Sequence, residues 1–282
     1  MATIHLTAEN FTPRVQRWLQ KPQTAKLLHL FDQVINLIDA DGEIVSVVQP
    51  NIRPGPFSLL IGEARPFPSL VAPFAPVAKT QAGLIIGPLA IDCRAAELWQ
   101  PSPDWPRLRE KQAAWLGTLG EMQTAVNNHL NDLNVSSPAN FTARFEGIIA
   151  ELLAVEVAAD PVAWQTAVTQ LAGLGPGFTP AGDDFLVGFL YGLWATRSAE
   201  EVVEMAQVVV ETAVPRTTQL SAAWLQAAGR GEAVEPWHEL VAALLDQSSW
   251  SLPVAAILQT GATSGASALL GFITAAQNSQ FR

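Results

Sequence analysis

A glycine-rich segment at residues 173–184, GLGPGFTPAGDD, has the residue types best suited to chemistry. Its three alternating glycines permit positive φ angles and a close approach of the backbone to a ligand. Thr179 followed by Pro180 is typical of a helix start, with a hydroxyl cap and then a proline at the first helical position. Free N–H groups and the dipole at a helix start favour a negative ligand. The segment therefore predicts an anion site whose candidate residues are Gly175, Gly177, Thr179 and Gly182.

Two adjacent carboxylates, Asp183 and Asp184, end this segment. Because they would repel a bare phosphate, they indicate a different role. They can hold a Mg²⁺ ion between themselves and a phosphate, or one of them can accept a proton or a hydrogen bond from an amide. The alternative is that both only stabilise the first helical turn through the helix dipole. We take both as candidate catalytic residues. No metal ligand is assigned, and Mg²⁺ is the one cofactor that the pair suggests.

Two later segments of the chain have a similar chemistry. Residues 215–221, PRTTQLS, place Arg216, Thr217 and Thr218 before a helix. Residues 261–267, GATSGAS, place Thr263 and Ser264 between two glycines before another helix. Ordinary capping and tight helix connections explain both segments. The alternative is that the arginine and the hydroxyls bind a carboxylate or a phosphate.

The hypothesis that unites these segments is convergence of the three helix starts. If they meet, backbone N–H groups, hydroxyls and Arg216 surround one small anion. A structure that places them on different faces overturns this hypothesis.

His238, in the helix start EPWHE at residues 235–239, is a further catalytic candidate. It can serve in acid–base chemistry or bind a carboxylate, and the alternative is a structural hydrogen bond. Cys93 is expected to be a small core residue rather than a nucleophile. The sequence contains no HExxH spacing, GxSxG elbow, Walker lysine or dinucleotide fingerprint.

The secondary structure predicted to position these residues differs between the two halves of the chain. Between residues 24 and 99, short β-branched runs alternate with prolines, and residues 34–38 and 43–48 flank an Asp-Gly turn typical of a hairpin. Further strands are predicted at residues 57–61, 83–86 and 89–92. These patterns favour a small, mostly antiparallel sheet or a partly open barrel.

Beyond a proline cluster at residues 101–106 the periodicity becomes helical. We predict helices at residues 108–133, 143–157, 162–172, 185–195, 200–213, 221–228, 237–245, 253–259 and 266–276. The predicted fold class is α+β. A small antiparallel β-rich domain over residues 1–105 precedes a mostly α-helical domain over residues 106–282, which carries the glycine-rich motifs.

The composition and charge of the chain limit the kinds of molecule that it can bind. Of the 282 residues, 49% are hydrophobic and 15% are charged, a balance that indicates a large buried core and argues against disorder. The formal net charge is −10. Residues 151–282 hold 4 basic and 13 acidic side chains, and no lysine follows Lys111. This half is a poor match for nucleic acid or an anionic membrane. The single cysteine excludes an intrachain disulfide, and the N-terminus lacks an apolar signal core, so we expect a cytoplasmic protein.

The same motifs carry a resemblance to a known family. They are GLGPGFTPAGDDFLVGF at 173–189, TTQLS at 217–221, GEAVEPWHEL at 231–240 and GATSGASALLGF at 261–272, with FDQVINLID at 31–39 and GPFSLLI at 55–61. Together they resemble a bacterial family long carried as a domain of unknown function. That family, with its GxTPxGDD motif, is associated with the AllH subunit of oxamate carbamoyltransferase.

The resemblance implies carbamoyl transfer in purine-nitrogen or allantoin breakdown, where oxalurate and phosphate give oxamate and carbamoyl phosphate, with other carbamoyltransferase subunits as partners. In this interpretation Gly175, Gly177 and Thr179 hold an anion. Asp183 orients or deprotonates the transferring nitrogen, or carries a metal. A second anionic group is bound by Arg216, Thr217 and Thr218. Fixed N–H and hydroxyl donors suit the oxyanionic centre of such a transfer.

Two other functions stay open at this point. One is a Mg²⁺-dependent hydrolase that uses Asp183 and Asp184 as ligands. The other is a non-catalytic assembly subunit whose glycine turns only pack helices tightly.

Overall fold

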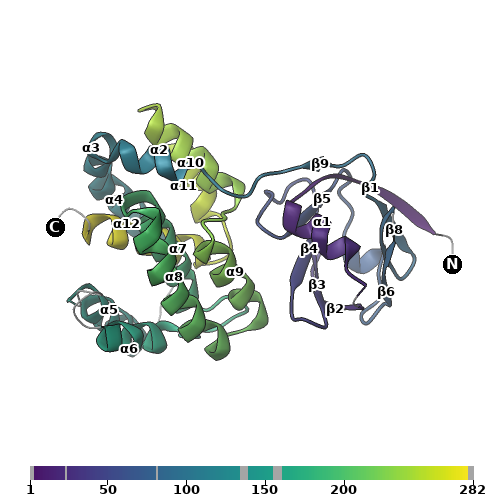
Figure 1. Ribbon diagram of the computed structural model, residues 1–282, viewed down its shortest axis with the longest axis horizontal. Helices are drawn as coiled ribbons and strands as arrows, with labels where there is room; N and C mark the ends of the chain where they lie inside the picture. The colour runs from purple at the N-terminus through teal and green to yellow at the C-terminus, as the bar shows by residue number, and fades with distance from the viewer. Residues whose placement is uncertain (1–2, 23, 81, 134–138, 155–160, 279–282) are drawn as a thin grey trace. The chain divides into compact units, whose positions relative to one another are not determined.

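The computed structural model describes residues 3–22, 24–80, 82–133, 139–154 and 161–278. The chain divides into two compact units, Met1–Pro101 and Ser102–Arg282 (Figure 1). The first unit contains the strands and the second contains helices, so the predicted α+β class is confirmed.

One curled sheet forms the N-terminal unit. Its elements are β1 (Ile4–Phe11), α1 (Pro13–Gln20), β2 (Ala25–Leu30), β3 (Val34–Asp39), β4 (Ile44–Val48), β5 (Ser58–Ile61), a 3-10 turn at Phe67–Ser69, β6 (Val77–Thr80), β7 (Gly83–Ile86), β8 (Leu89–Asp92) and β9 (Glu97–Leu98). The strand order is β2-β3-β4-β5-β1-β8-β7-β6, and β9 pairs with β1. Five strand pairs are antiparallel, whereas β1–β8, β1–β9 and β4–β5 are parallel. An isolated bridge between Lys26 and Pro76 brings the two ends of the sheet together.

The hairpin predicted around the Asp-Gly turn is confirmed as β3 and β4. Their register runs from Val34 opposite Val48 to Ile38 opposite Ile44. Gly42 in the connecting turn has a φ of 81°, a conformation that glycine adopts without strain. The core of this unit also contains the fully buried Trp18 of α1, a helix that the sequence analysis did not predict.

The C-terminal unit consists of helices. They are α2 (Trp105–Glu110), α3 (Gln112–Trp115), a 3-10 turn at Leu116–Thr118, α4 (Leu119–Asp132), α5 (Ala139–Ala154), α6 (Pro161–Leu171), α7 (Ala181–Thr196), α8 (Ala199–Ala213), a 3-10 turn at Val214–Arg216, α9 (Gln219–Gly229), α10 (Glu235–Leu245), α11 (Ser251–Leu258) and α12 (Ser264–Asn278).

One helix prediction was wrong. Residues 108–133 form α2, α3, a 3-10 turn and α4 rather than one helix. The chain leaves helical geometry at Lys111, where ψ is 23°, and the indole N–H of Trp115 donates to the Leu108 carbonyl at 3.0 Å. A tertiary arrangement of large side chains therefore overrides the helical periodicity. The end of the helix predicted at residues 143–157 lies partly outside the described residues.

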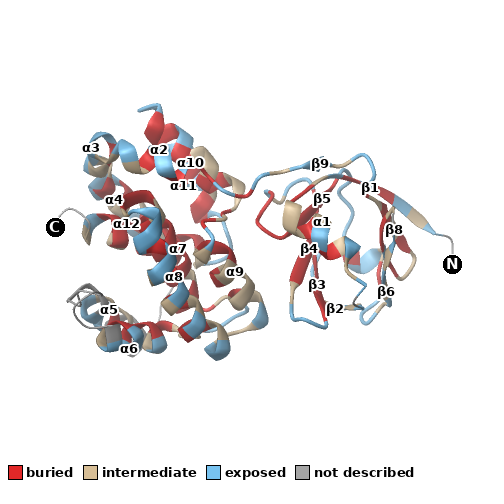
Figure 2. Ribbon diagram, viewed as in Figure 1, coloured by how far each residue is buried: buried red, intermediate tan, exposed pale blue. Residues whose placement is uncertain are grey.

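Helix α7 is buried along almost its whole length (Figure 2) and packs backbone to backbone against α12. A Cβ added to Gly188 would lie 1.7 Å from the Ala268 carbonyl oxygen, and one added to Gly192 would lie 2.6 Å from that of Phe272. Since later residues of α7 meet later residues of α12, the helices run in the same direction at this contact. Their N-terminal ends therefore lie at the same end of the pair.

Candidate functional site

The starts of α7, α9 and α12 lie together and are joined by hydrogen bonds. Thr179 Oγ1, before α7, is 3.0 Å from Ser264 Oγ at the start of α12. Thr218 Oγ1, at the start of α9, donates to the Phe178 carbonyl at 2.5 Å. The three segments that the sequence analysis singled out thus converge within one unit of the chain.

Asp183 fastens the glycine-rich loop to the start of α9. The side chain is only 1% exposed. Its Oδ1 accepts the Gly173 N–H at 2.9 Å, and its Oδ2 accepts the Thr217 hydroxyl. Burial raises the pKa of Asp183, and hydrogen bonds from Thr217, Gly173 and Ser221 oppose that rise. Because both oxygens have internal partners, Asp183 is best placed to position the loop.

Asp184 differs from its neighbour because one of its oxygens is left without a partner. Burial is the main cause that raises the pKa of this carboxyl to about 7, and the charge of Asp183 adds to the effect. Hydrogen bonds with Ser264 and Thr179 act in the opposite direction. Its Oδ2 is buried and has no hydrogen-bond partner among the described residues. A carboxyl that titrates near neutral pH can act as a general base or acid.

Asp184 lines a cavity of about 180 Å³ in the C-terminal unit. Its polar side chains are those of Thr179, Asp184, Thr260 and Ser264. Three aromatic side chains also line it, those of Tyr191, Trp224 and Trp237. The remaining lining residues are aliphatic or glycine: Val187, Val234, Ile257, Gly261, Gly265 and Ala268. The Tyr191 hydroxyl donates to the Glu232 carbonyl at 3.0 Å, and burial raises the pKa of Tyr191. A small cavity with a few polar groups and aromatic walls is typical of a small-molecule site.

The aromatic and aliphatic walls of this cavity were not predicted from the sequence. They belong to apolar helices that it predicted, but periodicity does not tell which apolar residues face a cavity rather than the core. The acidic and hydroxyl residues were found because they precede or begin helices.

The glycine-rich turn has the backbone geometry expected of it, with a φ of 120° at Gly175 and 100° at Gly177. Gly182, by contrast, packs closely against the backbone of Leu171. Its N–H donates to the Leu174 carbonyl at 2.9 Å, and a Cβ there would lie 2.0 Å from the Leu171 carbonyl oxygen. Its N–H group is therefore not available to an anion.

The predicted capping role of Thr179 was wrong. Helix α7 begins at Ala181, and its N-cap is Pro180, which has no side-chain capping bond. The Thr179 hydroxyl is instead paired with Ser264. Thr218 does cap a helix, since its Oγ1 accepts the Ser221 N–H at 3.1 Å.

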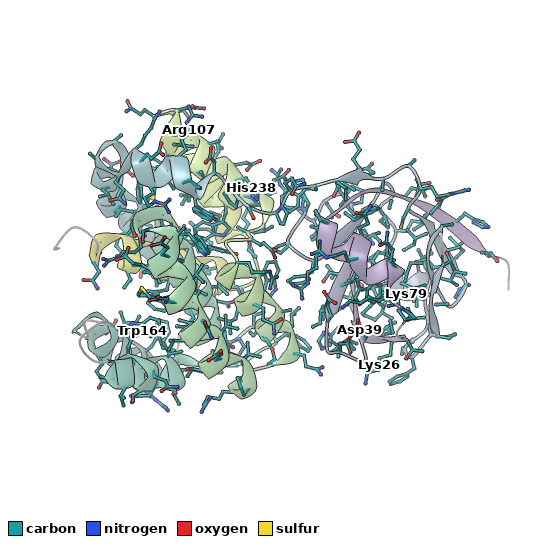
Figure 3. The ribbon with its side chains drawn as sticks, in the orientation of Figure 1. Lys26, Asp39, Lys79, Arg107, Trp164 and His238 are labelled. Carbon is teal, nitrogen blue, oxygen red and sulfur yellow. The ribbon has the colours of Figure 1, made fainter. Side chains whose placement is uncertain are left out.

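Arg216, Thr263 and His238 do not line the cavity at Asp184. Arg216 Nη1 donates to the Thr212 carbonyl at 2.5 Å, which holds this guanidinium at the end of α8. His238 lines a different cavity of about 260 Å³, together with Asp104 and Arg107. The reason is helical geometry: Trp237 lines the Asp184 cavity, and the next residue points about 100° away around the helix. Figure 3 labels His238, on α10, and Arg107, on α2.

Family comparison adds to this geometry. Residues 171–276 match the family model described as oxamate carbamoyltransferase subunit AllH, and residues 6–98 match the AllH family N-terminal domain. The chain belongs to the AllH family. Searches of curated proteins and of solved structures give no match.

The AllH match at residues 171–276 includes the segments that begin α7, α9 and α12. Within the described part of the chain, no cluster of three or more His, Cys, Asp or Glu side chains is arranged to hold a metal ion. No helix in that part is both long and apolar enough to cross a membrane.

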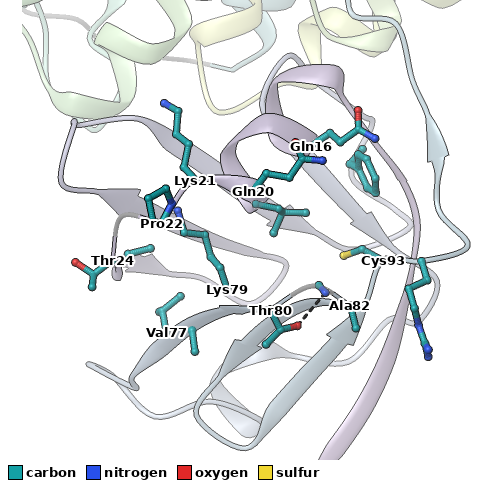
Figure 4. A pocket seen from close by; sticks show the side chains of 16 residues that line it. Gln16, Gln20, Lys21, Pro22, Thr24, Val77, Lys79, Thr80, Ala82 and Cys93 are labelled. Atoms are coloured by element: carbon teal, nitrogen blue, oxygen red, sulfur yellow. Dashed lines mark hydrogen bonds between the residues drawn. The ribbon is translucent and has the colours of Figure 1, made fainter.

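The AllH N-terminal domain contains a larger cavity, of about 720 Å³, lined from α1, β2 and β6 among other segments (Figure 4). Its basic side chains already have partners within the unit. Lys21 Nζ lies 2.6 Å from Glu43 Oε2, and Arg94 Nη2 lies 2.5 Å from Asp92 Oδ2. Lys79 Nζ donates to the Trp18 carbonyl at 3.1 Å and lies over the Trp18 ring. Because each of these cations already has a partner, the cavity at Asp184 is the better candidate for a functional site.

Proposed function

We propose that this chain is the subunit of an oxamate carbamoyltransferase that contributes the small-molecule site, and that the site is the cavity where α7, α9 and α12 begin. The observation that carries the proposal is the buried Asp184 Oδ2, which has no hydrogen-bond partner in the described part of the chain and belongs to a residue that lines a small cavity within the AllH match. The family name supports other carbamoyltransferase subunits as partners.

The proposed reaction joins oxamate and carbamoyl phosphate. A C–N bond forms between the oxamate nitrogen and the carbamoyl carbon, and the bond from that carbon to the phosphate oxygen breaks. The Asp184 carboxylate takes the proton that the nitrogen loses, and phosphate leaves. A base with a pKa of about 7 is suited to this step, because it is both substantially ionised and basic enough near neutral pH.

We further propose that the turn with Gly175 and Gly177 holds an anionic group of the substrates, and that Thr179 and Ser264 donate hydroxyl hydrogen bonds beside Asp184. Positive φ values at both glycines support this role, since they turn backbone groups in directions that other residues rarely allow. Asp183, Thr217 and Thr218 then act by positioning, because their side chains are bonded within the loop and helix starts. An assignment of the pathway to purine-nitrogen breakdown and of the protein to the cytoplasm stays a prediction.

The Mg²⁺-dependent hydrolase is less well supported. Such a site needs adjacent carboxylates that share an ion. Here both oxygens of Asp183 accept hydrogen bonds from the protein, whereas Asp184 bonds with Thr179 and Ser264. The two carboxylates therefore have separate surroundings.

The test is carbamoyl transfer by the complex reconstituted from this chain and its partner subunits. Asp184→Asn keeps the size of the side chain and removes its basicity, so we expect kcat to fall by about 10²–10⁴-fold. Asp132→Asn, at an exposed aspartate on α4, is the matched control and should leave the rate unchanged. Gel filtration confirms that both complexes assemble. Full activity in an assembled Asp184→Asn complex would instead support the non-catalytic assembly subunit.

A further inference from the structure

We infer that the cavity at Asp184 binds the uncharged amide end of the substrate and rejects phosphate and carboxylate groups. This inference rests on the proposed function and specifies which way round the substrate lies in that site.

The charge of the cavity is the first argument. Among the described residues that line it, Asp184 is the only acidic one, and none is a lysine, an arginine or a histidine. Arg216, the basic residue nearest in sequence to the start of α9, is held by the Thr212 carbonyl. A second negative charge inside a small, mostly apolar cavity would face the Asp184 carboxylate without a compensating cation. The cavity is therefore unfavourable to phosphate or to a carboxylate.

The unpartnered Asp184 Oδ2 is the second argument. This oxygen is buried and accepts no hydrogen bond from the described residues. A buried acceptor without a donor destabilises the protein, and the cost is larger when the acceptor is charged. A ligand N–H group that fills this position removes that cost. The cavity thus selects for a hydrogen-bond donor at Asp184.

The other polar groups argue for an amide rather than an ammonium ion. Hydroxyls of Thr179, Ser264 and Thr260 line the same cavity. The Thr179 and Ser264 hydroxyls bond to each other and to Asp184, so the hydroxyl of Thr260 is the one in this set that can donate to an acceptor such as a carbonyl oxygen. An amide supplies both the N–H donor for Asp184 and that acceptor, whereas an ammonium ion supplies only donors.

Size and shape are consistent with a flat group. The cavity has a volume of about 180 Å³. Trp224 and Trp237 form part of its wall. A primary amide, a urea or a carbamoyl group is small enough for this volume, and the charge of the cavity, rather than its size, keeps the anionic remainder of the substrate outside.

The experiment compares ligands that differ only in the group presented to Asp184. The full-length chain, and separately the assembled complex, is titrated with oxamate and with oxalate, in which an oxygen replaces the amide nitrogen. Acetamide with acetate forms a second pair, and guanidinium tests a cation. Indole N–H resonances of Trp224 and Trp237, assigned by Trp→Phe substitution, report binding at the cavity itself.

We expect oxamate and acetamide to bind about ten- to a hundredfold more tightly than oxalate and acetate, the ratio typical of one hydrogen bond to a charged group. Asp184→Ala should remove this preference, and Thr179→Ser, which keeps the hydroxyl, should retain it. Ser264→Ala provides a second variant that leaves the charge in place, and it should weaken amide binding by a smaller factor.

Three results would overturn the inference: oxalate binding as tightly as oxamate, guanidinium binding in preference to both amides, or no amide binding to either the chain or the complex. These results are distinguishable from failure of the proposed function. If Asp184→Asn abolishes transfer while oxalate binds as tightly as oxamate, the catalytic role of Asp184 is supported and the proposed orientation of the substrate is wrong. If amides bind as expected while the Asp184→Asn complex is fully active, the proposed orientation of the substrate is supported and the catalytic role of Asp184 is wrong.

Discussion

Replacement of Gly188 by alanine tests how the two site-bearing helices are held together. In an ordinary helix this substitution stabilises, because alanine has a helix propensity about 1 kcal/mol better than glycine. Here the new Cβ would lie 1.7 Å from the Ala268 carbonyl oxygen and 2.5 Å from its carbon. Both atoms belong to the backbone of α12, so the helices must separate by more than 1 Å to reach even a 3 Å contact. Overpacking of this kind costs about 1–3 kcal/mol, and sometimes more.

The assay is thermal and urea unfolding of the full chain, followed by far-ultraviolet circular dichroism. We expect Gly188→Ala to lower the unfolding free energy by about 2 kcal/mol, which corresponds to about 4–8 °C in the melting temperature of a unit of this size. The matched control is Gly147→Ala in α5, where nothing lies within 4 Å of the added Cβ. It should stabilise by about 0.5–1 kcal/mol. Equal stabilisation by the two substitutions would refute the close contact of α7 and α12.

Three further predictions concern single groups. Asp184→Asn should stabilise the chain at pH 8 and lose this advantage towards pH 4. Burial raises the pKa of Asp184 in the folded chain from 3.8 to about 7, so the natural chain loses stability as the pH rises between these values. Urea unfolding measured over this pH range checks the prediction, and equal pH slopes for the two chains would contradict it. A double-mutant cycle of Thr179→Val and Ser264→Ala should give a coupling of about 0.5–1.5 kcal/mol, and simple additivity would show that their hydroxyl pair contributes nothing. Cys93, whose thiol pKa is raised by burial to about 11, should react with iodoacetamide at pH 8 much more slowly in the folded chain than in urea, and equal rates would exclude this environment.

The sequence predicted best those parts of the site that have local signatures. The Asp-Gly turn between β3 and β4 and the Thr218 cap follow from rules that act within four residues. The glycine turn and the two aspartates were likewise visible as residue types at a helix start.

What the sequence could not predict depends on long-range packing. The roles of Asp183 and Asp184 differ because Thr217 and Gly173 bind the first carboxylate, whereas one oxygen of the second lies buried at a cavity. His238 was assigned to the site because of its chemistry, but the direction of its side chain on α10 is set by the burial of Trp237. Likewise, the glycines of α7 allow close contact with the backbone of α12, and that contact is not visible in the sequence.

The pH dependence of kcat for carbamoyl transfer by the assembled complex tests the central claim most directly. Asp184 as the general base predicts a rate that rises with pH through an apparent pKa near 7 and then levels off. In the Asp184→Asn complex, this rise should disappear along with most of the rate. An Asp184→Asn complex whose profile has the same rise and the same plateau as the natural complex would contradict the account.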